Sequence, residues 1–146
     1  MQVRRLEHYN IRTAKFTETV RFYVDVLGMR AAPPPGLPAD APPSWIYDAS
    51  GTPAVHLIGV DPTDPEASYA AKSGFRRGLN EQVAPTFSGS GAIDHIAFEC
   101  ADFDAALARV TALGLPFAQN EVAAIQLRQI FLQDPNGITL ELNFRN

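Results

Sequence analysis

The sequence predicts an α+β domain built from two halves that follow the same order of elements. Each half has a segment with apolar residues at helical spacing, preceded by a short alternating segment and followed by segments rich in β-forming residues. When His8 is aligned with His95, HYNIRTAKFTETVRFYVDVLG lies over HIAFECADFDAALARVTALG. Farther along, AVHLIG lies over TLELNF, which places His56 over Glu141. We therefore expect a strand, a helix and then further strands in each half.

The composition fits one globular domain. The chain has 146 residues, of which 46% are hydrophobic and 19% charged, so it can bury a sizeable core. The formal net charge of -4, without a basic patch, argues against nucleic acid as a partner. No apolar run is long enough to span a bilayer, the N-terminal segment lacks a signal-peptide apolar region, and Cys100 is the only cysteine. We expect a cytoplasmic protein with no membrane partner.

Both helices have boundary signals. Asp102 is the expected N-cap of the second helix, and Thr13 or Thr17 that of the first. Gly28 and Gly114 suit a left-handed backbone at the two C-terminal ends. The apolar positions at helical spacing are Phe16, Val20, Tyr23, Val24 and Leu27, and Phe103, Ala106, Leu107, Val110 and Leu113.

The other segments predict strands, turns and one long connection. Strands are expected at residues 44–47, 54–60, 124–132 and 138–144, a tight turn at 134–137, a proline-rich loop at 33–43, and a short helix near 67–72. The domain then spans residues 1–146, with module one at about 1–60, the connection at 61–91 and module two at 92–146.

All three histidines and one glutamate occupy equivalent places in the two halves. His8 and His95 lie at the start of each half, and His56 and Glu141 lie on the last strand of each. Imidazole nitrogen and carboxylate oxygen are ligands that borderline divalent metals prefer. We expect these four side chains to bind one ion of nickel, zinc, cobalt, manganese or iron. Three neutral imidazoles and one carboxylate would leave one net positive charge, which suits a substrate with oxygen donors. The alternative is that the histidines are ordinary polar residues in a cleft or on a surface.

Other polar residues are candidates for substrate contacts. Strand alternation places Asn10 and Arg12 on the face that carries His8. Arg12 and Arg128 could hold an anionic group of a substrate, although a surface salt bridge would explain either residue equally well. Arg76 and Arg77 lie in the long connection and could close over a cleft, or they could be ordinary solvated charges.

Four stretches resemble the vicinal oxygen chelate superfamily, which includes glyoxalase I, methylmalonyl-CoA epimerase, fosfomycin-resistance proteins, extradiol dioxygenases and bleomycin-resistance proteins. The stretches are EHYNIRTAKFTETVRFYVDVLGM, VHLIG, IDHIAFECADFDAALARV and FLQDPNGITLELNF. The resemblance implies a glyoxalase-like fold, in which two βαβββ modules form an eight-stranded, barrel-like cleft around a metal. It also implies ligands from the first and last strands of each module, at His8, His56, His95 and Glu141.

The resemblance implies a metal-dependent lyase or isomerase of the glyoxalase type. Such an enzyme would act on a small substrate with vicinal oxygens through an enediolate-like intermediate. Glu141 is the first candidate for the general base and Glu99 the second, although Glu99 is more simply explained as a solvated residue at a strand end. Arg12 fits a position that contacts glutathione in glyoxalase I. In that enzyme, however, glutamate is more typical at the position of His56 and asparagine at that of Val60, so the resemblance does not establish glutathione as a substrate.

Two other functions remain open at this point. An extradiol-type dioxygenase would use two histidines and one carboxylate, whereas His56 as a fourth ligand would leave no room for dioxygen. A drug- or metabolite-sequestering protein of the bleomycin-resistance type usually lacks the metal ligands. We also expect a homodimer, because two-module proteins of this kind often pair. The sequence identifies neither the substrate nor the metal, nor whether the modules pair within one chain or between two.

Overall fold

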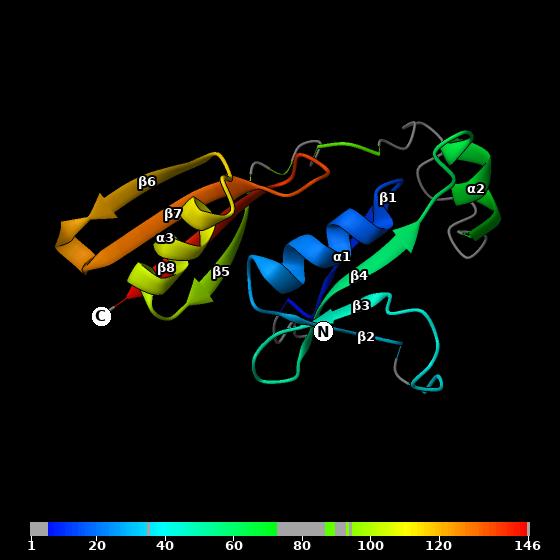
Figure 1. Ribbon diagram of the computed structural model, residues 1–146, viewed down its shortest axis with the longest axis horizontal. Coiled ribbons are helices and arrows are strands. Elements are labelled where there is room, and N and C mark those ends of the chain that lie inside the picture. Colours follow the sequence, from blue (N-terminus) through cyan, green and yellow to red (C-terminus); the bar gives the residue numbers. More distant parts are fainter. Residues whose placement is uncertain (1–5, 35, 73–86, 90–92, 94, 146) are drawn as a thin grey trace, which may run out of the picture. The chain divides into compact units, whose positions relative to one another are not determined.

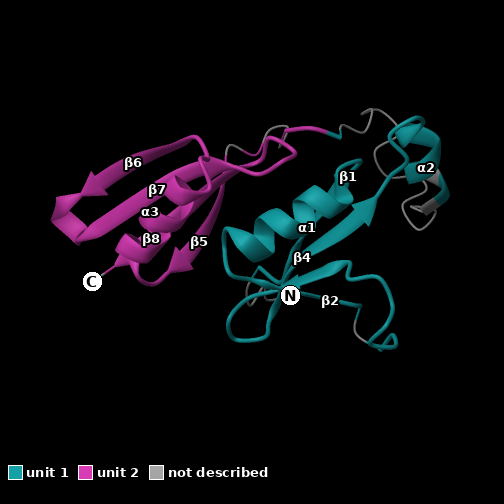
Figure 2. Cartoon of the chain, in the orientation of Figure 1, with its two compact units in different colours: residues 1–87 teal, residues 88–146 magenta. Residues whose placement is uncertain are grey.

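The chain forms two compact units, Met1–Phe87 and Ser88–Asn146 (Figure 2). The computed structural model describes residues 6–34, 36–72, 87–89, 93 and 95–145. The boundary between the units falls inside the connection predicted at 61–91. Each unit contains its own four-stranded sheet. No helix in the described part of the chain is long and apolar enough to cross a membrane.

The first unit is a mixed sheet with one helix between its first two strands (Figure 1). Its elements are β1 (Tyr9–Thr13), α1 (Phe16–Asp25), β2 (Arg30–Ala32), β3 (Trp45–Tyr47), β4 (Pro53–Gly59) and α2 (Pro65–Lys72). The strand order is β1-β4-β3-β2, and β1 runs parallel to β4 while the other pairs are antiparallel. The first and last strands of the unit are therefore neighbours.

The second unit repeats this arrangement. Its elements are β5 (Ile96–Cys100), α3 (Phe103–Ala112), β6 (Phe117–Val122), the 3₁₀ helix η2 (Ala123–Ile125), β7 (Leu127–Gln133) and β8 (Thr139–Arg145). The strand order is β5-β8-β7-β6, with β5 parallel to β8. The repeat read from the sequence is thus a repeat of topology, and the predicted α+β class is confirmed. The eight strands form two open sheets and do not close into one hydrogen-bonded barrel.

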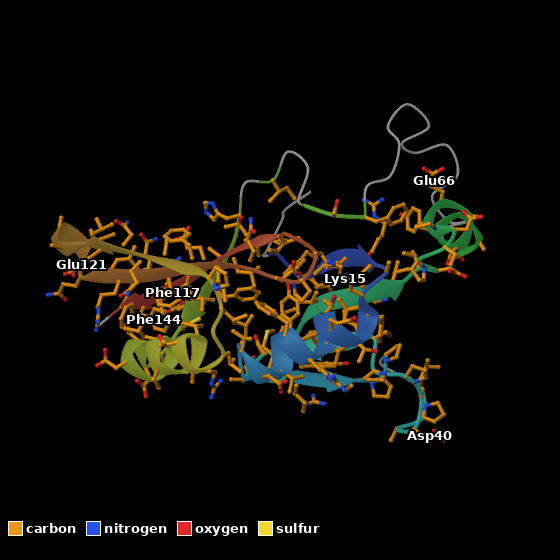
Figure 3. The ribbon with its side chains drawn as sticks, turned by 45° about the horizontal axis from the view of Figure 1, so that its top comes forward. Lys15, Asp40, Glu66, Phe117, Glu121 and Phe144 are labelled. Atoms are coloured by element: carbon orange, nitrogen blue, oxygen red, sulfur yellow. The ribbon has the colours of Figure 1, made fainter. Side chains whose placement is uncertain are left out.

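Alternation along the strands gives each sheet one apolar face. On β8, Leu140, Leu142 and Phe144 are buried on one side, and the ring of Phe144 lies 5.2 Å from that of Phe103 on α3 (Figure 3). In the first unit, α1 approaches β4 so closely that a Cβ on Gly59 would lie 3.1 Å from the ring of Phe16. The most deeply buried apolar residues are Tyr23, Ile46, Val55, Leu57, Val110, Ile130 and Leu140.

The turn at residues 134–137 forms as predicted. Asp134 is buried, and its Oδ1 atom accepts hydrogen bonds from the backbone N–H groups of Asn136 and Ile138 at 2.8 and 3.0 Å. Gly137 has φ 79°, a left-handed conformation that glycine adopts without steric cost. The turn joins β7 to β8 and so helps to fix the register of the strand that carries Glu141.

Several predicted boundaries differ from the structure. Strands β2 and β6 were not located from the sequence because they are short or mostly exposed. Residues 124–126 form η2 and its left-handed end at Gln126, φ 52°, so β7 begins later than predicted. The N-cap of α1 is Lys15, whose backbone N–H donates to Oγ1 of Thr13 at 2.8 Å, so the predicted threonine caps were wrong. Gly28 and Gly114 do adopt left-handed φ values of 66° and 65°.

The N-cap of α3 gives a direct test of how sequence sets this boundary. Asp102 has φ 60°, and its Oδ1 atom accepts a hydrogen bond from the Ala105 N–H at 3.0 Å. We expect Asp102→Ala to lower the free energy of unfolding by about 1–2 kcal/mol, because alanine neither caps the helix nor tolerates this φ. Asp102→Asn should lower the free energy of unfolding much less, because asparagine can cap the helix and also tolerates a positive φ. Urea unfolding of the full chain measures both changes, and equal losses in the two variants would contradict this explanation.

Candidate metal centre

In the first unit, strand pairing brings His8 and His56 to one face. The parallel register places Asn10 of β1 beside His56 of β4, and His8 precedes Asn10 by two residues. The centroids of the two imidazole rings lie 6.3 Å apart. Metal–nitrogen bonds of about 2.0–2.1 Å allow two imidazoles on one ion to have centroids up to roughly 6.5 Å apart. The observed 6.3 Å reaches this limit only if the two nitrogens lie on opposite sides of an ion, so tetrahedral binding would require the two rings to move closer together.

Trp45 of β3 packs against both histidines. It is the lateral neighbour of His56 on the adjacent strand, and the two rings stack with centroids 4.6 Å apart and planes 6° apart. The His8 ring meets the indole edge-on at 4.8 Å. We call His8, Trp45 and His56 the Trp45 cluster. Stacking restricts the orientation of the His56 ring, which is how a rigid site holds a ligand in place.

The surroundings of His56 favour its uncharged form. Burial lowers the pKa of His56 below its usual value of 6.5, and the neighbouring His8 lowers it further by charge repulsion. The Nδ1 atom of His8 is buried and has no hydrogen-bond partner among the described residues; the Oε2 atom of Glu7, at 3.3 Å, lies outside hydrogen-bonding geometry. A buried nitrogen that makes no hydrogen bond among the described residues, next to an imidazole whose pKa is lowered, fits a metal ion, because metals bind the neutral form of histidine.

In the second unit, the same strand pairing brings His95 to Glu141. The register pairs Ala97 of β5 with Glu141 of β8, and His95 precedes Ala97 by two residues. The Nε2 atom of His95 lies 2.9 Å from Oε2 of Glu141. The side chain of Glu141 is 12% exposed and that of His95 39%. This register confirms the alignment of Glu141 with His56, because Ala97 and Asn10 are equivalent.

Three amide side chains support Glu141. Gln129 of β7 donates through Nε2 to Oε1 of Glu141 at 2.6 Å and to Oδ1 of Asn143 at 3.0 Å. Asn120 of β6 donates through Nδ2 to Oε1 of Gln129 at 2.7 Å. We call Asn120, Gln129 and Asn143 the amide ladder. A hydrogen bond to a carboxylate is worth about 1.5–3 kcal/mol, so the contact with Gln129 holds Glu141 firmly.

Each unit thus brings together two of the four predicted metal ligands. Within the described ranges, no group of three or more His, Cys, Asp or Glu side chains lies close enough to hold an ion. The pairs are His8 with His56, and His95 with Glu141. The donor atoms of both pairs are of the kinds that divalent transition metals prefer.

The predicted substrate contacts in the first unit lie near the histidine pair. Asn10 is the strand neighbour of His56. Arg12, two residues farther along the same face, has its guanidinium carbon 5.0 Å from the ring centroid of Tyr69 and 6.0 Å from that of Phe87. These rings hold the guanidinium by cation–π attraction. The other two arginines considered as candidates, Arg76 and Arg77, lie outside the described residues.

Two candidates in the second unit lie on opposite faces of the sheet. Glu99 is the strand neighbour of Asn143 and shares the face of Glu141 with an exposed side chain. Arg128 pairs with Phe144 and so lies on the face covered by α3, away from Glu141. The guanidinium carbon of Arg128 lies 3.5 Å from the Phe103 ring centroid.

The Nη1 atom of Arg128 also lies 3.4 Å from the Asp104 carboxylate. The Arg128 and Asp104 side chains are 40% and 85% exposed, so their ion pair contributes at most about 1 kcal/mol. These contacts give Arg128 a surface packing role, and the structure does not bring it together with the predicted ligands.

Sequence reasoning missed the residues that support the ligands. Trp45 is the only tryptophan in the chain and lies in a predicted strand, but its place beside His56 depends on strand pairing. Phe131 holds the equivalent position beside Glu141 and lies 6.4 Å from the ring of His95. The contact of Gln129 with Glu141 and Asn120 likewise depends on the register of β6, β7 and β8. Aligning β3 with β7 in the sequence repeat could have predicted that Trp45 and Phe131 occupy equivalent positions.

Comparisons with known proteins agree with the fold. Residues 5–142 match the family model described as the Glyoxalase/Bleomycin resistance protein/Dioxygenase superfamily. A glyoxalase/dioxygenase from Nostoc punctiforme is 18% identical, with a TM-score of 0.63 over 97% of this chain and 92% of that one. A genomically encoded fosfomycin resistance protein from Listeria monocytogenes is 14% identical, with a TM-score of 0.59 over 99% and 96%.

A lactoylglutathione lyase from Agrobacterium tumefaciens is 16% identical, with a TM-score of 0.56 over 94% of this chain and 91% of that one. No curated protein matches this chain in sequence. At these identities the solved structures support the same fold and do not identify a reaction.

The lowered pKa of His56 predicts a pH dependence of stability in the metal-free protein. Because the folded-state pKa lies below the unfolded value near 6.5, the unfolded chain binds more protons between the two values. The neutral side chain therefore stabilises the fold fully above about pH 6.5, and this contribution is lost as the pH falls through the folded-state pKa.

The free energy of unfolding of wild type should therefore exceed that of His56→Gln by less at pH 5 than at pH 8. Urea unfolding with a chelator present measures this difference. A difference that stays constant with pH would contradict the assignment.

Proposed function

The chain belongs to the Glyoxalase/Bleomycin resistance protein/Dioxygenase superfamily, and from this premise we propose that it is a metal-dependent lyase or isomerase of the glyoxalase type. The observation that carries the proposal is the equivalence of two ligand pairs in the two units. His8 and His95 precede matching parallel strands, and His56 and Glu141 lie at matching positions on the strands beside them. A sequestering protein would have no need of donors at matching positions in both halves.

We propose that the two pairs bind one divalent ion of nickel, zinc, cobalt, manganese or iron. Three imidazoles and one carboxylate suit these metals and leave one net positive charge on the ion. A bound ion would act as a Lewis acid toward two neighbouring oxygens of a small substrate. The pairs could come from one chain or from two, and we propose a homodimer, as is common among two-module proteins.

His56 decides between the two enzymatic functions. As a fourth ligand it favours a lyase or isomerase, whereas a site of His8, His95 and Glu141 alone would suit an extradiol-type dioxygenase. The structure supports ligation by His56 in two ways: its ring lies 6.3 Å from that of His8, and its pKa is lowered, so it is neutral at pH 7. We therefore propose the four-ligand site, with the dioxygenase as the second candidate.

Proton abstraction requires a carboxylate that can reach the substrate. Glu141 is in contact with both His95 and Gln129, which suits a ligand held in place better than a base that moves. Glu99 lies on the same face with an exposed side chain. Glu141 and Glu99 therefore remain the two candidates for the general base, and the structure favours Glu99 more than the sequence did.

Substrate contacts are proposed at Asn10 and Arg12. Asn10 lies beside His56, and Arg12 carries a positive charge on the same face, two residues farther along β1. The contacts of Arg12 with Tyr69 and Phe87 hold its guanidinium against two aromatic rings. An anionic group on a small substrate is the partner that this charge suits. Cys100, the single cysteine, fits a cytoplasmic enzyme.

The first test of the proposal is metal content. We expect purified protein to bind about one divalent ion per chain, and His8→Ala and His95→Ala each to lose most of the affinity, because the two residues belong to different pairs. Elemental analysis and calorimetric titration measure both quantities. Absence of bound metal after reconstitution with all five ions would refute an enzyme of this type. Loss of affinity in only one of the two variants would show that one unit binds the ion alone.

The second test concerns His56. We expect His56→Ala to remain folded and to bind the ion about 10–100-fold more weakly than wild type, the usual cost of losing a ligand or its support. Ile58→Ala is a matched control, because Ile58 lies on the same face of β4 and has no donor atom. Titrations at one pH compare the three proteins. If His56→Ala binds the ion as tightly as wild type, the site has three ligands and the dioxygenase becomes the better proposal.

A further inference from the structure

We infer that Gln129 is a positioning residue that fixes the carboxylate of Glu141 through the amide ladder. This inference rests on the proposed role of Glu141 as a metal ligand. Gln129 is 7% exposed and lies on β7, the strand next to the one that carries Glu141. Its amide forms hydrogen bonds with the Glu141 carboxylate and with the amides of both Asn120 and Asn143.

The ladder determines which way the Gln129 amide points. Its Nε2 atom donates to two oxygen acceptors, one on Glu141 and one on Asn143, while its Oε1 atom accepts from Asn120. A rotated amide would bring its oxygen against the Glu141 carboxylate, which is a repulsive contact, and would lose the hydrogen bond from Asn120 unless the Asn120 amide rotated as well. Asn120, although it is exposed on β6, therefore maintains the donor of Gln129 toward Glu141.

The direction of this hydrogen bond assigns different tasks to the two oxygens of Glu141. Oε1 is held by Gln129 at 2.6 Å, and Oε2 lies on the side of His95 at 2.9 Å. A carboxylate held through one oxygen loses rotational freedom before an ion arrives. The other oxygen is then aligned with the neighbouring imidazole, which is the preorganisation that a tight metal site requires.

The described part of the first unit has no equivalent of Gln129 beside His56. Trp45 occupies the position equivalent to Phe131, each beside the candidate ligand of its unit. Two residues before Phe131 lies Gln129, whereas two residues before Trp45 lies Pro43, which has no side-chain donor. His56 is instead held by ring stacking. The side-chain donor, Gln129, is therefore present in the second unit, where the candidate ligand is the carboxylate of Glu141.

Four proteins test the inference: wild type, Gln129→Met, Asn120→Ala and Gln133→Met. Methionine keeps the length of glutamine and removes its hydrogen-bonding groups. Gln133 lies on the same strand and face as Gln129 but pairs with Thr139, so it is the matched control. Cobalt(II) affinity is measured by calorimetry, the unfolding midpoint of the metal-free proteins by urea, and the position of the Glu141 carboxylate by metal-free crystal structures.

We expect Gln129→Met to bind cobalt(II) about 10–100-fold more weakly than wild type, Asn120→Ala to show a smaller loss, and Gln133→Met to show none. The loss of cobalt(II) affinity should be larger, as a free energy, than any loss of stability seen in the unfolding midpoint. A residue with only a structural role would change the stability first. Unchanged affinity in both Gln129→Met and Asn120→Ala would overturn the inference. If Gln129→Met does not fold, unchanged affinity in Asn120→Ala alone overturns it, because that residue is exposed.

The metal-free crystal structures separate this inference from the proposed function. If wild type binds no cobalt(II), the proposed metal site fails, but the position of Glu141 still reports on the ladder. A carboxylate that leaves its wild-type position in Gln129→Met supports the positioning role. A carboxylate that stays in place in that variant overturns the role, whatever the metal affinity.

Discussion

The parallel pairing of the first and last strands in each unit is the constraint on which the candidate metal centre depends. It places His8 and His56 on one face of the first sheet and His95 and Glu141 on one face of the second. A shift of β8 by one residue would turn Glu141 toward α3 and expose Leu140 and its apolar neighbours. Burial of a leucine side chain is worth about 1.5–3 kcal/mol, so the apolar face protects the register that the polar face needs.

The two units hold their candidate ligands by different interactions. In the first, Trp45 stacks on His56 and meets His8 edge-on, so aromatic contact orients the two imidazole rings. In the second, the amide ladder donates to the charged carboxylate of Glu141. The difference follows from the ligand types, since an imidazole has a flat apolar surface and a carboxylate needs donors. A repeated fold has therefore acquired two kinds of ligand support.

Much of the fold could be predicted from the sequence because its signals are local. Helical spacing located α1 and α3, Asp102 marked the start of α3, and the turn before β8 had a distinctive sequence. The alignment of His56 with Glu141 also followed from local pattern. Strands β2 and β6 were not located, since three residues or an exposed segment give little alternation to detect.

The supporting residues could not be predicted, because their roles depend on pairing between distant strands. Arg128 shows the same limit: its sequence position suggested an anion contact, but its register with Phe144 places it on the face covered by α3. Gln129, only one residue away, lies on the opposite face in contact with Glu141. Alternation separates such neighbours, but only the register shows which of them meets the candidate ligands.

The proposed function depends most on whether His8, His56, His95 and Glu141 bind a single ion. X-ray absorption spectroscopy of the cobalt-loaded protein tests it most directly, because multiple scattering from imidazole rings counts the histidines bound to the metal. The account predicts three imidazoles and one carboxylate in the shell, with every cobalt ion in the same environment. A shell with two imidazoles or fewer, or a mixture of two different shells, would contradict it.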